Sequence, residues 1–574
     1  MQKIEEAAIG TKSNPAVFLI LAVSFILNSL GLQWGVPSAE RNSLYFSDEA
    51  GIRKSLERVD PEEVADSMAG KKEGLSGSAF APIKSYHPDE SNFIKAISNM
   101  KPKKLDFNPH YLYYGTMYIY SFAAVLAAGV VFRIIKPTTD ILFYFTHPAE
   151  IAKFYVAGRL VSVIFAVLLV YVIYRLARKL YGEKTGLFSA LALAVTPALV
   201  VNSHFLSVDV TMSFFVFLTM LFAARILSSG ELKWYVLAGI CAGLAAQSKY
   251  NAALVALAVP VAGLLRTCGK KTDILLCWFE KKALLSYACA LGIFILFLLP
   301  FVFTTIPEFS RNFSAGMFRI GPRISSVASN TVFFTEALYH GMGLPLFLLA
   351  AAGVVMAVMK REKADIFFIF WIAINMLILV IMSPLGDRHM RYLLIILPAL
   401  AVLAARFMAA VCAMRPANKV VPVLIALVAC VPTLLFSAGY DRVFMQENTR
   451  TSAGKWIAQN IPAGSSIGLR RDPWQYETPP VNQAKYRLCI TGKLASESAK
   501  AIAEKKPGYF VISNAEYIGY REEWNSVLKN AGYGLVKEFS NPPRVFGVAF
   551  NNSAEPADDY TYFYPEIRIY KSEK

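Results

Sequence analysis

Long apolar blocks alternate with short polar loops over most of this chain. The longer blocks have about 17 to 23 residues, close to the length of helix that crosses roughly 30 Å of hydrocarbon. They occupy residues 16–32, 154–174, 187–201, 210–226, 234–246, 252–265, 284–303, 343–358, 366–382, 392–414 and 420–436. The first block lacks a small-residue cleavage site, so we expect a retained span rather than a signal peptide. The pattern predicts a polytopic α-helical membrane protein.

A further apolar block, residues 111–135, is ambiguous. Cytoplasmic loops of membrane proteins hold an excess of Lys and Arg. If this block does not fully cross the membrane, most of the basic loop residues lie on the cytoplasmic side. They are Arg175, Arg178, Lys179, Lys184, Lys233, Arg266, Lys270, Lys271, Lys281, Lys282, Lys360, Arg361, Lys363, Arg415 and Lys419. The other side keeps Lys249, Arg311, Arg319, Arg323, Arg388 and Arg391. We therefore expect a juxtamembrane or re-entrant segment, whose Tyr-rich start suits the interface; the alternative is a full span that breaks the charge rule.

This assignment predicts about eleven spans, with the N-terminus cytoplasmic and the C-terminus outside. Residues 1–438 would form the membrane domain, with a first outer loop at 35–153, and residues 439–574 a small α/β extracytoplasmic domain. In that second domain the spacing predicts helices at 450–460, 498–504 and 522–530 and strands at 466–469, 509–512 and 545–550.

Composition agrees with a membrane protein, since 55% of the residues are hydrophobic and the mean hydropathy is +0.43. The net charge of +17 comes largely from short loops, which makes it a topology signal and argues against nucleic-acid binding. All cysteines but Cys489 lie in or beside the apolar blocks, and no Cys-x-x-Cys pair occurs. The sequence therefore indicates neither a disulfide framework nor a zinc site.

Two acid pairs lie in the first outer loop, Asp48-Glu49 and Asp89-Glu90. The second pair precedes Asn108-Pro109-His110-Tyr111 in the same loop. A carboxylate in such a place can serve a reaction, or it can cap the helix that the residues after Asp89 predict. The two roles are compatible, and the sequence leaves the two pairs in competition.

A third acid, Asp209, stands between two spans on the outer side, with His204 shortly before it. An ionisable residue at the membrane edge is costly unless it is paired or hydrated, which makes Asp209 a functional candidate; the alternative is a cap for the next span. An interfacial histidine such as His204 is more often satisfied locally than used as a ligand.

Cations gather on the same outer side. Lys249 interrupts an apolar region, Arg388 and Arg391 flank His389-Met390, and Arg159 lies early in the second span. Arginine suits phosphate because its planar fork makes paired hydrogen bonds. These side chains either hold an anionic lipid headgroup or simply anchor helix ends at the interface.

A series of short motifs follows one order along the chain: Asp89-Glu90, Asn108-Pro109-His110-Tyr111, Tyr114-Gly115, Gly158-Arg159-Leu160, Ser203-His204 with Asp209, Ser248-Lys249-Tyr250, and Arg391-Tyr392 before Pro398. In this order the chain resembles the GT-C class glycosyltransferases of family 39. These include polyprenyl-phosphate-dependent protein mannosyltransferases and lipid A aminoarabinose transferases. The resemblance covers roughly residues 16–436, with further similarity from Thr449-Arg450 to Ile461-Pro462.

The resemblance implies a GT-C-like membrane domain that moves a sugar from polyprenyl phosphate, for example undecaprenyl phosphate, to an acceptor hydroxyl with inversion. Asp89 matches the catalytic base, Glu90 its companion, and Asp209 the second acid of the site. The donor phosphate would meet Lys249, Arg388, Arg391 and Arg159, and the sugar or acceptor would be positioned by His110, Tyr111, His204 and Tyr250. The long first loop departs from the family pattern and keeps Asp48-Glu49 as the alternative acid pair.

The expected partners are the polyprenyl-phosphate-linked sugar, an acceptor protein, lipid or glycan, and membrane lipids, with no nucleic acid. We expect a multi-pass protein of a cell membrane, and we expect that membrane to be the bacterial inner membrane. No cofactor is certain, and a divalent metal ion stays open because no ligand set is specific enough to name one. The rival hypotheses are a transporter or lipid flippase, and a binding protein whose ectodomain does the work. A transporter would carry ionisable residues near the bilayer midplane and internal repeats, and we find no repeat.

Overall fold

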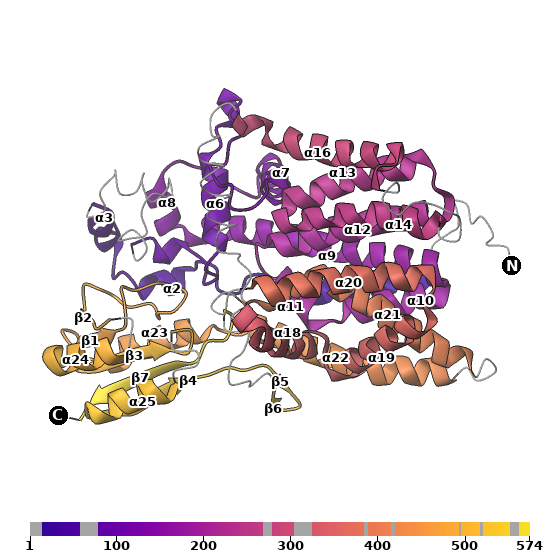
Figure 1. Cartoon of the computed structure of the whole chain (residues 1–574). Coiled ribbons are helices and arrows are strands. Elements are labelled where there is room, and N and C mark those ends of the chain that lie inside the picture. Colours follow the sequence, from indigo (N-terminus) through magenta and orange to yellow (C-terminus); the bar gives the residue numbers. More distant parts are fainter. Residues whose placement is uncertain are drawn as a thin grey trace.

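The computed structural model describes residues 14–57, 79–267, 278–302, 324–383, 388–414, 420–492, 495–516, 521–550, 559 and 562–573. Cys268, Cys277 and some of the basic loop residues, Lys270, Lys271, Arg311, Arg319, Arg323, Arg415 and Lys419, lie outside these ranges. A helical bundle carries the elements of the first loop and a C-terminal α/β domain at one and the same end (Figure 1).

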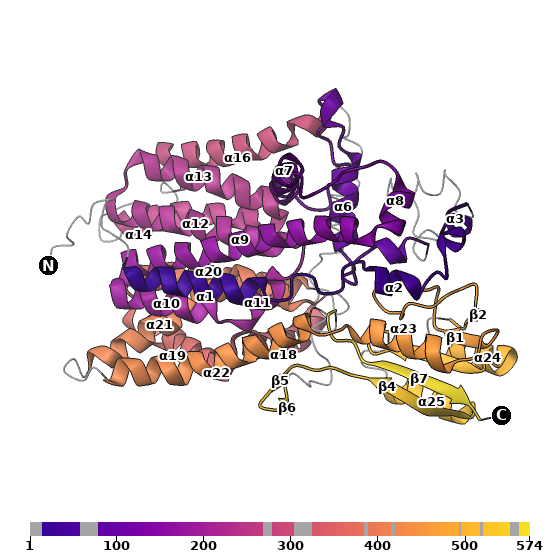
Figure 2. The ribbon, with the colours of Figure 1, turned by 180° about the vertical axis from the view of Figure 1, so that it is seen from behind.

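The bundle is built from helices that follow the predicted apolar blocks. In chain order they are α1 (Pro15–Ser29), α9 (Pro148–Tyr181), α10 (Glu183–Ala194), α11 (Pro197–Ser203), α12 (Val208–Ser229), α13 (Leu232–Ser248), η3 (Tyr250–Leu257), α14 (Ala258–Thr267), α16 (Lys281–Val302), α18 (Val327–Met342), α19 (Leu344–Lys360), α20 (Lys363–Met382), η5 (Met390–Ile395), α21 (Leu397–Ala413) and α22 (Val420–Met445). From behind, α1 lies along α9 and α10 (Figure 2).

Among the described residues, six helices are long and apolar enough to cross a membrane, or up to eight if two bent pairs each count as one span. The expectation was about eleven. Part of the difference comes from short helices, because α1 has 15 residues and α13 and α21 have 17 each. Each bent pair has a proline just after the break: Pro197 is the first residue of α11 after a 54° bend, and Pro345 is the second residue of α19 after a 118° bend.

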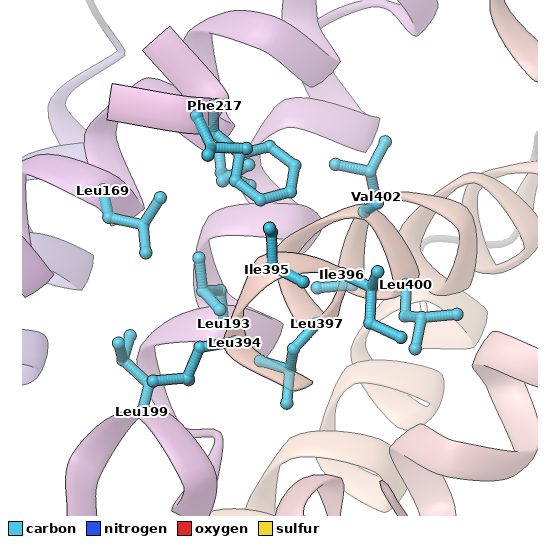
Figure 3. Packing of buried hydrophobic residues seen from close by; sticks show 14 of the residues in the cluster. Leu169, Leu193, Leu199, Phe217, Leu394, Ile395, Ile396, Leu397, Leu400 and Val402 are labelled. Atoms are coloured by element: carbon cyan, nitrogen blue, oxygen red, sulfur yellow. The ribbon is translucent and has the colours of Figure 1, made fainter. Parts of the chain in front are cut away.

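The main hydrophobic core lies in the middle of the bundle, where the earlier helices pack against η5 and α21. Leu169, Leu193 and Phe217 point toward Ile395 and Val402, so that α9, α10, α12, η5 and α21 share one apolar centre (Figure 3). Small residues allow the close approach of neighbouring helices. A Cβ on Gly353 of α19 would lie 2.2 Å from the Leu403 carbonyl oxygen of α21, so only glycine fits there.

The first loop folds into short helices at one end of the bundle. They are α2 (Ala39–Ser43), α3 (Glu49–Glu57), η1 (Ala81–Ile83), α6 (Glu90–Asn99), η2 (Pro102–Lys104), α7 (Met117–Val131) and α8 (Ile141–Thr146). The ambiguous block became α7, which is seen end-on in both views while α9, α12 and α13 run across the picture (Figures 1 and 2). The helix of this block therefore runs across the direction of the bundle helices, and the juxtamembrane assignment stays a prediction.

The C-terminal domain begins after α22, which continues to Met445 and so passes through the expected boundary at 438. Its helices are α23 (Thr449–Asn460), α24 (Ala495–Lys505) and α25 (Arg521–Asn530). Its strands are β1 (Ser466–Leu469), β2 (Arg487–Ile490), β3 (Tyr509–Ser513), β4 (Tyr533–Phe539), β5 (Arg544–Val545), β6 (Val548–Ala549) and β7 (Ile567–Ser572).

Five strands form one sheet in the order β2-β1-β3-β7-β4, in which β2, β1 and β3 are parallel and β7 is antiparallel to both its neighbours. The three predicted helices and the strands at 466–469 and 509–512 are present. The strand predicted at 545–550 is instead a short β5-β6 hairpin outside the main sheet. Strands β2, β4 and β7 were not predicted, because their positions in the sheet depend on partners far away in the sequence.

Candidate active site

The adjacent acids Asp89 and Glu90 separate at the start of α6. Glu90 is the first residue of the helix and is fully buried, whereas the Asp89 side chain is 37% exposed and makes no capping hydrogen bond. Because Asp89 precedes the helix and Glu90 is its first residue, the two neighbouring carboxylates point into different environments. Glu90 belongs to the protein interior, and Asp89 faces the end of the bundle.

Glu90 is held by the guanidinium group of Arg159 on α9. Arg159 Nε donates to Glu90 Oε1 at 2.9 Å and Nη2 to Oε2 at 2.7 Å, while Ser85 Oγ and the Leu206 backbone N–H donate to the same carboxylate. Arg159 Nη1 also donates to the carbonyls of Leu32 and Trp34. Burial alone would raise the pKa of Glu90, but the Arg159 charge and hydrogen bonds hold it below its usual value.

This buried pair joins α6 to the polar ends of α1, α9 and the turn before α12. Both side chains are fully buried, so Arg159 lies in the interior and all of its described contacts are with the protein. The guanidinium N–H groups of Arg159 are taken by Glu90 and by two backbone carbonyls, and its contact with the donor phosphate stays a prediction. The described contacts of Arg159 connect α9 to Glu90, the residue that follows Asp89.

Asp89 meets Arg391, which follows the break between α20 and η5. Arg391 Nη2 lies 3.5 Å from Asp89 Oδ2. The same guanidinium lies 3.3 Å from Asp559 Oδ1, and the Arg391 backbone N–H donates to Asp559 Oδ2 at 2.7 Å. Asp559 belongs to the C-terminal domain and is buried. Arg391 thus connects three distant parts of the chain beside a partly open carboxylate.

Asp209 and Lys249 form a second ion pair near this point. Lys249 Nζ donates to Asp209 Oδ1 at 2.8 Å, and Ser207 Oγ donates to Asp209 Oδ2 at 3.0 Å. Asp209 lies in the first turn of α12 and Lys249 follows the last turn of α13, positions that suit an acid at a helix N-terminus and a cation at a C-terminus. The Lys249 ammonium also lies 4.7 Å from the ring centre of Tyr392.

The phenol of Tyr114 links the two ion pairs. Burial raises the pKa of Tyr114, and the charges of Arg391, Asp89 and Asp209 all act on it. Lys249 Nζ lies 5.8 Å from its ring centre. The four charged residues therefore surround one aromatic side chain.

Aromatic and histidine side chains complete the wall on the side of the C-terminal domain. The ring of His87 packs at 4.9 Å from that of Tyr562, and Arg391 lies over the same tyrosine at 5.9 Å. Burial lowers the pKa of His87 to about 4. His87 is therefore neutral near pH 7 and adds no charge to the site.

Three of the predicted site residues lie elsewhere. Arg388 donates to Ser329 at 2.9 Å and covers Phe333, so its guanidinium is turned toward α18. His204 is buried, with its ring nitrogens 2.7 Å and 2.5 Å from the carbonyls of Val200 and Leu30. His110 is exposed, in the left-handed region at φ 46°.

Tyr111 and Tyr250 support the segment that carries Tyr114. Tyr111 packs edge-on against Phe93 at 5.8 Å, and Tyr250 donates to the carbonyls of Leu112 at 3.0 Å and Tyr114 at 3.1 Å. Both side chains therefore fix the backbone next to Tyr114. Burial raises the pKa of Tyr111, and the charges of Asp89 and Arg391 act on it as well, so Tyr111 lies near the site.

The competing acid pair, Asp48-Glu49, lies at the start of α3. Asp48 Oδ1 accepts from the Gly51 backbone N–H at 2.7 Å, and Glu49 pairs with Arg53 on the exposed face of the same helix. Helix α3 packs against α8 at the edge of the molecule, away from the helical bundle in both views (Figures 1 and 2). The structure brings Asp89, and not Asp48, to the cations.

Sequence reasoning missed Asp559, Tyr562 and Tyr392. Tyr392 stood in the motif Arg391-Tyr392 but received no role. No local pattern distinguishes Asp559 from the other acids of the tail, because its contact with Arg391 exists only after the C-terminal domain has docked on the bundle. Among the described residues no group of three or more His, Cys, Asp or Glu side chains is close enough to hold a metal ion.

The comparisons with known proteins agree with the class suggested by the sequence. Residues 151–302 match the family model of dolichyl-phosphate-mannose-protein mannosyltransferases. A search of curated proteins gives no match. The resemblance to GT-C transferases of family 39 is thereby confirmed over a segment that contains Arg159, Asp209 and Lys249. Together with the apolar helices, the match supports a multi-pass membrane glycosyltransferase.

Solved structures with a similar arrangement include two that hold a polyprenyl phosphate. The oligosaccharyltransferase AglB from Archaeoglobus fulgidus, in complex with an inhibitory peptide and a dolichol-phosphate, is 14% identical over 96% of this chain and 76% of its own, with a TM-score of 0.44. ArnT from Cupriavidus metallidurans, bound to undecaprenyl phosphate, is 13% identical over 96% of this chain and 97% of its own, with a TM-score of 0.44.

Proposed function

We propose that this protein transfers a sugar from a polyprenyl phosphate to an acceptor hydroxyl on the extracytoplasmic side of the membrane, with inversion at the anomeric carbon. The observation that carries the proposal is the partly open carboxylate of Asp89 beside the half-buried cations Arg391 and Lys249. Of the three acids in the cluster, Asp209 and Asp559 are buried and paired with Lys249 and Arg391, whereas Asp89 is 37% exposed. Asp89 is thus the carboxylate that an acceptor can reach.

In this mechanism Asp89 removes the proton of the acceptor hydroxyl as the oxygen attacks the anomeric carbon. The bond between that carbon and the phosphate oxygen breaks at the same time, and the polyprenyl phosphate leaves with the bonding electrons. Arg391 and Asp559 hold the loop of Asp89 at a fixed distance from the bundle. We assign Arg391 to positioning of the base, because its guanidinium is already shared by two carboxylates.

The leaving phosphate needs a cation on the other side of the sugar, and Lys249 supplies it. An ammonium group has three N–H donors, of which Asp209 takes one. Tyr114 and Tyr392 flank the ammonium, so part of its surroundings is aromatic rather than water. In such surroundings a fixed cation stabilises developing negative charge better than it does in water.

The function is tested with purified protein in lipid nanodiscs, a radiolabelled polyprenyl-phosphate hexose or pentose, and fractions of envelope lipid, protein and glycan as acceptors. We expect label to move to one of these fractions. Mass spectrometry of the envelope from a deletion strain then identifies the acceptor. Transport of the intact labelled lipid across a vesicle membrane, without cleavage of the sugar, would instead support the flippase hypothesis.

Replacement of Lys249 by methionine is expected to weaken the binding of polyprenyl phosphate about tenfold to a hundredfold, because a charge-assisted hydrogen bond contributes about 1.5–3 kcal/mol. The measurement is the Kd for the labelled carrier lipid. In the single variant the buried Asp209 carboxylate would lose its cation. The double variant Lys249→Met/Asp209→Asn removes that charge and should bind the carrier lipid as weakly as Lys249→Met does. Arg388→Gln is the matched control, since this arginine contacts Ser329 and Phe333. Equal Kd values for Lys249→Met and wild type would remove Lys249 from the donor site.

A further inference from the structure

A groove opens on the side of the bundle, at the end away from the candidate active site. It has a volume of about 580 Å³ and lies between the second half of α9, the middle and later part of α12, and the start of α13. The candidate site uses the opposite ends of the same three helices, at Arg159, Asp209 and Lys249. The groove is therefore a separate feature of the molecule.

The wall of the groove is aliphatic and aromatic. Its central part is formed by Leu168, Val172, Phe214, Leu218, Leu221 and Leu237. Leu168 and Leu237 are 40% and 36% exposed, so their side chains stand open to the surroundings of the bundle. In a membrane those surroundings are hydrocarbon, and such a surface suits an acyl chain.

Cations stand at one end of this wall. Arg175, Arg225 and Lys233 line the groove together with Trp234. Arg225 and Lys233 lie over the Trp234 ring at 5.4 Å and 4.9 Å, and Arg175 donates to the Tyr171 hydroxyl at 2.8 Å. Lys233 has Glu231 at 2.6 Å, but among the described residues no carboxylate forms an ion pair with Arg175 or Arg225.

Two arginines without a carboxylate, above an apolar groove, are complementary to a ligand with an anionic head and a hydrocarbon tail. Aromatic and basic residues of this kind mark the headgroup level of a bilayer, where basic pockets between helices bind anionic lipid headgroups. The Glu231 charge acts on Arg225, but within the described ranges neither guanidinium group has an ion-paired carboxylate. Two such groups are costly near hydrocarbon, and a phosphate between them would offset this cost.

We propose that this groove is a binding site for an anionic phospholipid of the leaflet opposite the active site. Its acyl chain lies along Leu168 and Leu218, and its phosphate is held between Arg175 and Arg225. The lipid joins α9, α12 and α13, the three helices that carry Arg159, Asp209 and Lys249 at their other ends. It is distinct from the sugar donor, whose phosphate is proposed to bind at Lys249.

The test uses the full chain, reconstituted in vesicles of equal parts phosphatidylglycerol and phosphatidylcholine and extracted in a mild detergent. Native mass spectrometry then measures which lipid stays bound. Wild type is expected to retain phosphatidylglycerol in preference to phosphatidylcholine. The double variant Arg175→Gln/Arg225→Gln should lose this preference, with bound phosphatidylglycerol reduced about tenfold or more.

Two further variants separate the groove from general surface charge. Arg361→Gln/Lys363→Gln removes two exposed cations from the turn between α19 and α20 and should bind as wild type. Leu168→Trp fills the groove without a change in charge and should also lower the amount of bound lipid. Undiminished phosphatidylglycerol in either groove variant, or equal retention of the two lipids by wild type, would overturn the proposal.

Discussion

Replacement of Asp89 by asparagine is expected to lower the rate of sugar transfer by about 10²–10⁴-fold, the usual contribution of a general base. The amide has the same shape but does not take up the proton of the acceptor hydroxyl. Folding should be preserved, because the Asp89 side chain is 37% exposed and makes no hydrogen bond to the first turn of α6. The measurement is the initial rate of transfer from a radiolabelled polyprenyl-phosphate sugar.

The control for this prediction is Asp48→Asn, in the alternative acid pair. Asp48 accepts from the Gly51 backbone N–H in α3, and no cation of the site contacts it within the described part of the chain. Its variant should transfer at the wild-type rate. Binding of the donor lipid should be nearly unchanged in Asp89→Asn, which separates loss of the base from loss of the substrate. Wild-type transfer by Asp89→Asn would remove the proposed base from the mechanism.

Replacement of Glu90 by glutamine is expected to destabilise the protein by about 3–5 kcal/mol, because it leaves the Arg159 guanidinium buried without its counter-ion. Both side chains are fully buried, and their two hydrogen bonds join the first loop to α9. The measurement is the apparent Tm and the fraction of monodisperse protein after extraction. Since the pKa of Glu90 is lowered by folding, this stabilisation is complete above its unfolded-state pKa of about 4.3 and is lost as the pH falls through the lower folded-state value.

The matched control is Glu49→Gln, which breaks the exposed pair with Arg53. The two side chains of that pair are 56% and 58% exposed, and such pairs contribute less than about 1 kcal/mol. A double-mutant cycle with Arg159→Gln should give a large coupling energy for the buried pair. If Glu90→Gln melts at the same temperature as Glu49→Gln, Glu90 does not hold the loop in place.

Several elements were predictable because their signals are local. The apolar blocks gave the bundle helices, and the helical and strand patterns of the tail gave α23, α24, α25, β1 and β3. The charge distribution of the loops predicted a juxtamembrane or re-entrant segment at residues 111–135. Helix α7 in this block lies across the bundle direction, and its place at the membrane surface stays a prediction. Strands β4 and β7 were missed because their pairing depends on distant chain segments rather than on their own sequence.

The candidate site required more than local signals. Asp89 and Glu90 are neighbours with similar chemistry, and only the rotation of α6 places one of them against Arg159 and the other beside Arg391. Arg388 and Arg391 lie three positions apart, and the sequence does not distinguish their roles. In the structure the Arg388 side chain turns toward α18 and the Arg391 side chain toward Asp89. Burial and direction of a side chain depend on the packed helices, so the sequence could propose these residues but not divide the roles among them.

The sequence by itself determined that this protein is a helical membrane protein with a small α/β domain, because helix length and apolar pattern depend on residues that are contiguous in the chain. It also determined the order of motifs that resembles GT-C transferases. The tertiary structure alone decided that Asp89 is the open acid, that Glu90 and Arg159 form an interior pair, and that Asp559 of the C-terminal domain reaches Arg391. The reason is physical: charge pairing and solvent exposure depend on distances between segments that are far apart along the chain.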